Sequence, residues 1–260
     1  MKIIVAIKQV PARDSQLRIA ASGQWIEEAG LAYEINEPDA YALEAGLRLK
    51  EKHGGEVVAL CAGPERVGQS IREALAKGAD RAIHIESSDE SELAAFDALG
   101  VARLLAAAVQ DEQADLILTG LQSDDLGLGQ TGVILAELLG LPHATLILKI
   151  EKTENGIKVL RELEDGWFQH LELSTPAVLT IQSGNSKLRY ATLMGIKKAK
   201  TKEVRVVSVA ELAGAASNPV VKLEKVVLPH KQRTTQILGG SPAEAAAALV
   251  EKLQFEVRVL

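Results

Sequence analysis

The sequence predicts an α/β fold in which a doubly wound parallel sheet carries an added antiparallel hairpin and a C-terminal arm. Two observations lead to this prediction. As far as Gly140, short apolar runs alternate with helical patterns in a β-α-β-α-β-α-β-α order, which is typical of a parallel sheet with right-handed crossovers. After Pro142, short strand-like runs are separated by turn residues, which indicates antiparallel pairing.

Length and composition narrow the function classes. The chain has 260 residues, 47% of them hydrophobic, and this is enough for one large α/β core. No apolar run approaches the length of a membrane span, so we expect a protein of the cytoplasm or of an organelle matrix, with no direct membrane insertion. The net charge of -6 argues against nucleic acid as a partner. The single cysteine, Cys61, and five histidines without ligand spacing predict no disulfide framework and no metal site.

The first half of the chain supplies the predicted parallel sheet. Lys2 to Gln9 is a near-continuous apolar run, typical of a strand buried on both faces, and we expect it to be the central strand. Leu17 to Ile26 has the pattern of a small hairpin that decorates the edge of the sheet. The elements expected next are a helix ending before Gly54-Gly55, a strand from Glu56 to Ala62, a helix from Glu65 to Lys77, a strand from Arg81 to Ile85, and a helix from about Glu92 to Val109.

The first helix has a clear start signal. Asn36 can cap it, and Pro38 is pre-organised for the first turn. Asp39 suits the positive end of the helix dipole. The segment INEPD therefore predicts where this helix begins.

A glycine-rich stretch follows the fourth predicted strand, Asp115 to Thr119. We call Gly120 to Thr131 the glycine loop; a helix opens at its end, near Gln130, and stops at Gly140. A helix start offers unpaired N–H groups and partial positive charge, and glycines let the backbone approach an anion, so this stretch predicts a nucleotide-phosphate cradle. Gln130 and Thr131 can add side-chain donors. A flexible loop is the alternative.

Gly127 and Gly129 of the glycine loop, together with Gly132 just after it, match a G-x-G-x-x-G spacing. In a nicotinamide-binding fingerprint the first glycine follows the first strand almost at once. Here seven residues intervene and three strands come earlier, so we reject that interpretation. The chain also lacks a Walker-type phosphate loop and a nucleophile elbow, and catalysis is therefore not supported.

Four stretches end or begin where a doubly wound sheet binds its ligand, outside the carboxyl ends of its strands. They are Ala6 to Gln9, the cap at Asn36, the turn at Ala62-Gly63, and the glycine loop. Their shared position favours a nucleotide site over a flexible loop. Asp124-Asp125 can bind a metal–nucleotide complex, although paired acids in such loops more often cap turns or bind a ribose.

The second half of the chain predicts a meander, a linker and a terminal helix. The linker-like stretch is Ala213 to Pro219, and the helix from Glu244 to Leu253 needs a surface on this domain or on another subunit. We predict a nucleotide-binding α/β domain over residues 1–185, a partner-recognition loop over 186–202, and a C-terminal arm and helix over 203–260. The expected strands are Ala144 to Glu151, Ile157 to Leu163, Trp167 to Leu173 and Ala177 to Ile181.

One stretch of this acidic chain is strongly basic. Lys187 to Lys202, the basic segment, contains six cationic residues and no acid. A solvated loop is the simplest interpretation, but Leu193 and Met194 lie between the cations at an expected exposed turn. Apolar residues in such a place are better explained as an anchor that fills a partner's pocket, with the charges steering the encounter.

Three stretches together resemble the small (beta) subunit of electron transfer flavoprotein, of the AMP-binding type. They are INEPDAYALEAGLRLKE, GLQSDDLGLGQTG and LRYATLMGIKKAK, and the likeness spans most of the chain. The resemblance implies an adenine nucleotide alpha-hydrolase-like fold and a heterodimer whose large (alpha) subunit holds most of the FAD. It implies that this chain buries a structural AMP, and that Gln130-Thr131-Gly132-Val133 follows the AMP type rather than the type that binds a second FAD.

The resemblance also implies site residues and partners. Leu193 occupies the position of the family's anchor leucine, which docks into dehydrogenases, and a downstream quinone oxidoreductase receives the electrons. The C-terminal helix would pack on the large subunit. The implied partner-binding residues are Arg189, Tyr190, Leu193, Met194 and Lys197. The implied AMP-binding residues are Ala6, Asn36, Glu37, Pro38, Asp39, Ala62, Gly120, Gln122, Ser123, Asp124, Asp125, Gly127, Gly129, Gln130 and Thr131, with Gln130 and Thr131 at the phosphate.

Two functions are therefore weighed. The first is an electron-carrier subunit that accepts electrons at FAD from dehydrogenases such as acyl-CoA oxidising enzymes, and passes them toward the quinone pool. It is not an enzyme and makes no bonds. The alternative is an ATP-binding or ATP-hydrolysing module of the adenine nucleotide alpha-hydrolase type.

Overall fold

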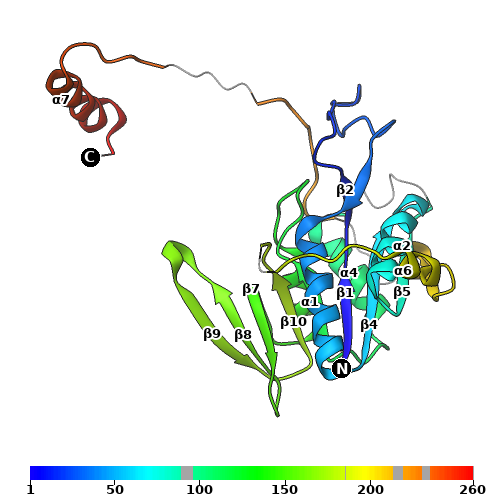
Figure 1. Ribbon diagram of the computed structural model, residues 1–260. Coiled ribbons are helices and arrows are strands. Elements are labelled where there is room, and N and C mark those ends of the chain that lie inside the picture. Colours follow the sequence, from blue (N-terminus) through cyan, green and yellow to red (C-terminus); the bar gives the residue numbers. More distant parts are fainter. Residues whose placement is uncertain (89–95, 185, 213–218, 230–234, 260) are drawn as a thin grey trace.

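The chain folds around a single large sheet. The computed structural model describes residues 1–88, 96–184, 186–212, 219–229 and 235–259. The sheet has nine strands in the order β11-β5-β4-β1-β6-β10-β7-β8-β9 (Figure 1). The strands are β1 (Lys2–Ala6), β4 (Glu56–Gly63), β5 (Arg81–Glu86), β6 (Leu116–Gly120), β7 (His143–Lys152), β8 (Ile157–Glu162), β9 (Phe168–Leu173), β10 (Ala177–Ile181) and β11 (Val204–Ser208).

The strand directions match the predicted fold class. The strands from β11 to β7 are parallel neighbours, while β7, β8 and β9 pair antiparallel as an added meander at one edge. Strand β1 lies in the middle of the parallel part, and Ile3, Ile4 and Val5 are fully buried. The near-continuous apolar run is explained by this burial on both faces.

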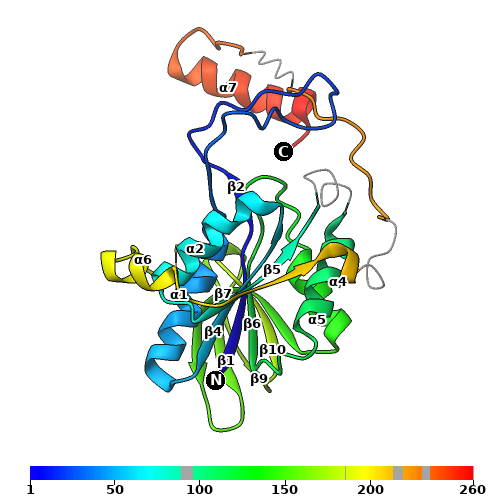
Figure 2. The same cartoon turned by 90° about the vertical axis from the view of Figure 1, so that its right-hand side faces the viewer.

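Helices cover both faces of the parallel sheet, as a doubly wound fold requires (Figure 2). Helices α1 (Glu37–His53) and α2 (Gly68–Lys77) pack on one face, and α4 (Ala98–Val109) and α5 (Thr131–Leu139) pack on the other. Each face has its own apolar cluster, centred on Leu43, Leu47 and Ile71 on one side and on Leu104 and Leu135 on the other. The fold class is thus confirmed.

The predicted start of α4 was wrong. Residues 92–95 lie outside the described residues, but Phe96 and Asp97 precede the helix, which begins at Ala98. The carboxylate of Asp97 accepts a hydrogen bond from the N–H of Gly100, 2.9 Å away. Asp97 is therefore the N-cap, which fixes the start of α4 at Ala98.

The N-terminal region also departs from prediction. The first strand ends at Ala6, and Gln9 belongs to β2 (Gln9–Pro11), which pairs with β3 (Tyr33–Ile35) in a separate two-stranded sheet. Leu17 to Ile26 turns back on itself through one bridge, between Ile19 and Ile26. It does not decorate the edge of the large sheet, whose outer strands are β9 and β11. Two backbone hydrogen bonds flank this bridge, from the N–H of Ala20 to the carbonyl of Trp25 and from the N–H of Glu27 to the carbonyl of Arg18.

The second half contains two elements that the sequence did not predict. Strand β11 adds to the sheet beside β5, and α6 (Leu193–Ala199) replaces the turn expected in the basic segment. Short helical turns complete the description: η1 (Glu65–Val67), η2 (Glu164–Gly166), η3 (Val209–Leu212), and η4 (Leu253–Val257), which continues α7 (Pro242–Lys252).

Helix α7 is where the sequence placed the terminal helix. Ser241 and Glu244 form its capping box. No residue of α7 is buried, although Leu249 and Val250 are apolar and about half exposed. Among the described residues, no helix is both long enough and apolar enough to cross a lipid bilayer.

Candidate functional site

The polar residues predicted at the strand ends do lie together, at the switch point of the sheet. Strand β1 pairs with β4 on one side and with β6 on the other. The chain leaves β1 through α1 toward β4 but leaves β6 through α5 toward β7, so the winding direction reverses between β1 and β6. Ala6 ends β1, and Ala62 lies near the end of the neighbouring β4. Both strand ends thus carry a small side chain.

Asp39 joins the ends of β1 and β6. One carboxylate oxygen accepts a hydrogen bond from the backbone N–H of Lys8 and the other from that of Gly120, both at 2.8 Å. A Cβ at Gly120 would lie 2.7 Å from the Cβ of Pro38 and closer still to the Asp39 carboxylate. Residue 120 must therefore be glycine for this clamp to form.

The Asp39 carboxyl is buried, and this changes its titration. Burial raises the pKa of Asp39 to about 7, although hydrogen bonds from Lys8, Gly120 and Asn36 and the charge of Lys8 favour the ionised form. Between the unfolded pKa near 3.8 and the folded value, the unfolded chain has lost a proton that the folded chain keeps. Stability from this group therefore falls as pH rises through that window.

A pH titration tests this coupling. We expect the free energy of unfolding of the wild type, relative to Asp39→Asn, to fall by about 3 kcal/mol between pH 4 and pH 7. Urea unfolding at several pH values measures the difference, and the asparagine variant cancels the titration of every other acid. A pH-independent difference would show that Asp39 is ionised throughout.

Asn36 holds the glycine loop from below. Its side-chain amide donates to the carbonyl of Gln122 at 3.0 Å and accepts from the N–H of Asp124 at 2.9 Å. Asn36 occupies the predicted N-cap position, but its side chain makes no capping hydrogen bond. The capping role predicted for this side chain was wrong, because the loop takes both ends of its amide.

The acids of the glycine loop are paired with cations. The ammonium of Lys8 lies 2.6 Å from a carboxylate oxygen of Asp125 and also reaches the hydroxyl of Ser123. Arg13 pairs with Glu37 and lies 3.5 Å from Asp124. Burial opposes ionisation of Asp125, but Lys8 outweighs it and holds the pKa of Asp125 below its ordinary value. The two cations therefore offset most of the charge of these three carboxylates, which repel a bound anion less than free acids would.

Lys8 and Arg13 were not identified from the sequence. Lys8 stood within a predicted strand, and Arg13 follows Pro11 in a loop. The available signal was Lys8 at the carboxyl end of the first predicted strand, because that end was already expected to lie near the acids Asp124 and Asp125.

Helix α5 begins on top of β6 and β10. A Cβ at Gly132 would lie 2.6 Å from the hydroxyl of Thr119 and 2.7 Å from the methyl of Thr180, so only glycine lets the helix start so close to the sheet. Gln130 stands at the N-cap and makes no side-chain capping bond within the described chain. The first N–H groups of α5, from Thr131 onward, thus lack the usual side-chain acceptor.

A buried hydroxyl lies beside this helix start. Thr180 is 2% exposed, and among the described residues its hydroxyl oxygen has no hydrogen-bond partner. Gly127 and Gly129 take positive φ values of 62° and 63° in the loop above. Left-handed glycines, free N–H groups and an unpaired hydroxyl are what an anion-binding helix start offers.

The basic segment lies on the opposite face of the sheet from α5, beside α2 (Figures 1 and 2). Tyr190 and Leu193 are each 89% exposed, and Met194 and Lys197 are also exposed. Leu193 and Met194 open α6, whose N-cap Thr192 accepts from the N–H of Gly195. The exposed apolar residues are where the sequence placed them, but on a helix rather than a turn.

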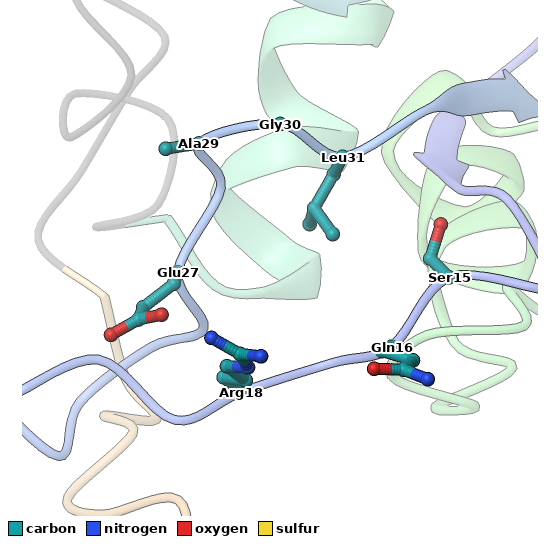
Figure 3. Close-up of a pocket in the computed structure, with 7 residues that line it drawn as sticks. All are labelled: Ser15, Gln16, Arg18, Glu27, Ala29, Gly30 and Leu31. Atoms are coloured by element: carbon teal, nitrogen blue, oxygen red, sulfur yellow. The ribbon is translucent and has the colours of Figure 1, made fainter.

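A surface cavity of about 230 Å³ lies in the N-terminal loop (Figure 3). Leu31 and Arg18 point into the space between the two arms of the loop. No residue of the predicted site lines this cavity. Its lining consists of Ser15, Gln16, Arg18, Glu27, Ala29, Gly30 and Leu31.

Metal ligands are not assembled anywhere in the described ranges, where no group of three or more His, Cys, Asp or Glu residues could hold an ion. Cys61 is buried in β4, and burial raises the pKa of its thiol to about 12. The fold and the polar network define a doubly wound α/β protein of the class that binds ligands at the switch point of its sheet.

Comparison with known proteins identifies the family. The electron transfer flavoprotein domain matches residues 24–212. The electron transfer flavoprotein subunit beta of Methylophilus methylotrophus is 38% identical, over 96% of this chain and 97% of its own length. Those of Bacillus subtilis and of Arabidopsis thaliana, the latter named mitochondrial, are 34% and 33% identical over the full length of both chains.

The chain belongs to the electron transfer flavoprotein family, among its beta subunits. Proteins of this family are electron carriers rather than enzymes, and this chain is an electron-carrier subunit.

Proposed function

We propose that this chain pairs with a large (alpha) subunit to form an FAD-containing electron carrier, and that it holds a structural AMP at its switch point. The carrier accepts electrons from dehydrogenases, such as acyl-CoA dehydrogenases, and passes them to a quinone oxidoreductase. The relatives carry the name subunit beta, which supports a second subunit. Because they come from bacteria and from a mitochondrion, we place the carrier in a bacterial cytoplasm or an organelle matrix.

The observation that carries the AMP proposal is the helix start at α5. Free N–H groups at Thr131, the adjacent side chain of Gln130 and the cradle at Gly132 fit a phosphate. Lys8 pairs with Asp125, and Arg13 lies between Glu37 and Asp124, so these two cations offset most of the negative charge that a nucleotide meets there.

The remaining predicted AMP residues divide by what their side chains do. Asn36 and Asp39 use their side-chain oxygens on backbone N–H groups, so we assign them to shaping the site rather than to contacting the nucleotide. Ala6 and Ala62 leave space for a planar group above the strand ends. Glu37, Pro38, Gly120, Gln122, Ser123, Asp124, Asp125, Gly127 and Gly129 form the walls.

FAD, when bound, supplies the redox chemistry of the carrier. This chain's own residues contribute a docking surface and a rigid frame rather than groups that transfer protons or make bonds. The exposed apolar tip of α6 beside Lys197 supports the docking role.

Nucleotide analysis tests the AMP proposal. We expect the complex, co-expressed with its large subunit and purified without added nucleotide, to release stoichiometric AMP and FAD on denaturation. Gly132→Ala should lose AMP, because its new methyl group collides with Thr119 and Thr180. The matched control is Gly68→Ala at the start of α2, where the nearest atom is 3.7 Å away. A nucleotide-free wild type, or turnover of ATP, would overturn the proposal.

A second variant tests the docking residue. Leu193→Ala should weaken binding to an acyl-CoA dehydrogenase by about tenfold to a hundredfold, because burying one leucine contributes roughly 1.5 to 3 kcal/mol. The AMP and FAD contents should not change. Leu138→Ala, which removes an exposed leucine from α5 on the other face, is the control. Equal affinities for the wild type and Leu193→Ala would exclude Leu193 as the anchor.

A further inference from the structure

The basic segment is held at both ends by the helices beneath it. At its start, Arg48 on α1 donates to the carbonyl of Lys187 at 2.9 Å. At its end, the ammonium of Lys202 donates to the carbonyls of Leu75 and Ala79 at the end of α2. In between, a Cβ at Gly195 would collide with a carbonyl oxygen of α2, so α6 lies directly against that helix. The segment is therefore a fixed part of the surface.

A further attachment, with more hydrogen bonds than the others, is made by Arg189. Its Nε donates to Glu44 at 2.8 Å, and its Nη1 donates to Glu51 at 2.6 Å. Its Nη2 reaches both carboxylates, at 3.3 Å and 3.1 Å. Glu44 and Glu51 are both on α1, so one guanidinium spans two turns of that helix.

Burial makes this attachment hard to release. The side chain of Glu44 is 4% exposed, and it also accepts from Arg48 at 2.6 Å. Burial opposes its ionisation, but Arg189 and Arg48 hold the pKa of Glu44 below its ordinary value. Breaking the pair with Arg189 would leave the buried carboxylate of Glu44 with Arg48 but without its second cation, which is destabilising.

The charges and hydrogen bonds of this cluster limit what else Arg189 can bind. Two arginines face two glutamates, so the cluster is neutral overall, and four of the five guanidinium N–H directions of Arg189 are taken up by Glu44 and Glu51. Little charge or donor capacity is left for a partner. The next residue, Tyr190, and Leu193 three further on are almost fully exposed. The clamp thus lies immediately before the residues that project outward.

We infer that Arg189 is a positioning residue: its clamp to Glu44 and Glu51 holds Tyr190 and Leu193 in the conformation that the dehydrogenase binds. The inference rests on the proposed function and deepens it. A segment that is already ordered before docking loses little conformational entropy when it binds. Its affinity for the partner is therefore higher than that of a flexible segment with the same contacts. Arg189 therefore acts through α1 and not by touching the partner.

The first test measures order without any partner. In the purified complex with its large subunit, Arg189→Gln should raise amide hydrogen exchange across residues 190–199 by about tenfold, because local opening becomes easier. Arg72→Gln removes an exposed arginine from neighbouring α2 and is the matched control. Unchanged exchange in Arg189→Gln would overturn the inference.

The second test is a double-mutant cycle on docking. Arg189→Gln should raise the KM of an acyl-CoA dehydrogenase for the complex about tenfold and leave kcat unchanged. In a Leu193→Ala background the same substitution should add little, because a positioning residue has nothing left to position. The weakening should also persist at high salt, unlike loss of a direct ion pair with the partner.

The outcomes separate the two proposals. If Leu193→Ala alone weakens binding, additive effects in the cycle would assign Arg189 to direct contact and overturn the inference, and so would a salt-sensitive loss in Arg189→Gln. Faster exchange with unchanged KM would overturn it as well. If Leu193→Ala binds normally while Arg189→Gln binds weakly and exchanges faster, the leucine anchor fails but the clamp stands.

Discussion

Asp39→Ala is expected to lower the free energy of unfolding by about 2 to 6 kcal/mol. The substitution removes both acceptors of the clamp, so the buried N–H of Gly120 and the partly buried N–H of Lys8 lose their partner. Each orphaned group costs about 1 to 3 kcal/mol. Because Lys8 lies just after β1 and Gly120 begins the glycine loop, the same change should release bound nucleotide.

Urea unfolding at constant pH measures this loss. Asp39→Asn should fall between the wild type and the alanine variant, because its amide oxygen accepts one N–H while its amino group faces the other. Asp14→Ala, at an exposed position in the N-terminal loop, controls for removing a carboxylate and should change little. An alanine variant as stable as Asp14→Ala would mean that water reaches the clamp.

Glu112→Gln is expected to lower the free energy of unfolding by about 2 to 3 kcal/mol. Breaking a fully buried ion pair costs about 3 to 5 kcal/mol. The loss here should be smaller, because the side chain of Arg205 is partly exposed to water. Glu112 is largely buried and lies 2.5 Å from Arg81, 3.2 Å from Arg205 and 3.7 Å from Lys2. These cations come from β5, β11 and β1. Glutamine keeps the shape and removes the charge that holds three strands together.

Amide hydrogen exchange of Glu112→Gln measures which strand is destabilised. The amides of β11 should open first, because that strand lies at the edge and Arg205 is one of its ties to α4 through the carbonyl of Ala108. Glu151→Gln breaks an exposed pair with Lys149 and serves as the control, with little change expected. Equal protection of β11 in both variants would exclude Glu112 as the central charge. The wild-type contribution should be lost in acid, since Arg81 holds the pKa of Glu112 below its ordinary value.

The parts of the fold that sequence predicts well are those determined by local patterns. The apolar run that became β1 and the glycine that ends α5 both act within a few residues. The side chain of Asn36 shows the limit of this reasoning. Its type is right for a helix cap, but its partners Gln122 and Asp124 lie 86 and 88 positions away, and nothing local reveals them.

Strand β11 and helix α6 were missed for a related reason. β11 is five residues long and half exposed at the edge, so it lacks the apolar run of a buried strand. α6 is seven residues long and is stabilised by the Thr192 cap and by contact with α2 rather than by propensity. The location of the site could be predicted, because strand ends can be read from the sequence. The cations that balance its acids could not, because their partners are set by the fold.

The pairing of β11 with β5 has a consequence for how this surface can diversify. The chain leaves β10 in the interior of the sheet, crosses over α1 and α2, and returns to the sheet at its far edge. The crossing is attached to α1 at its start and to α2 at its end. Its outward-facing residues can therefore change without changing these attachments or the sheet. Grafting Tyr190–Lys197 between relatives should accordingly transfer the preference for an electron donor and leave the sheet folded.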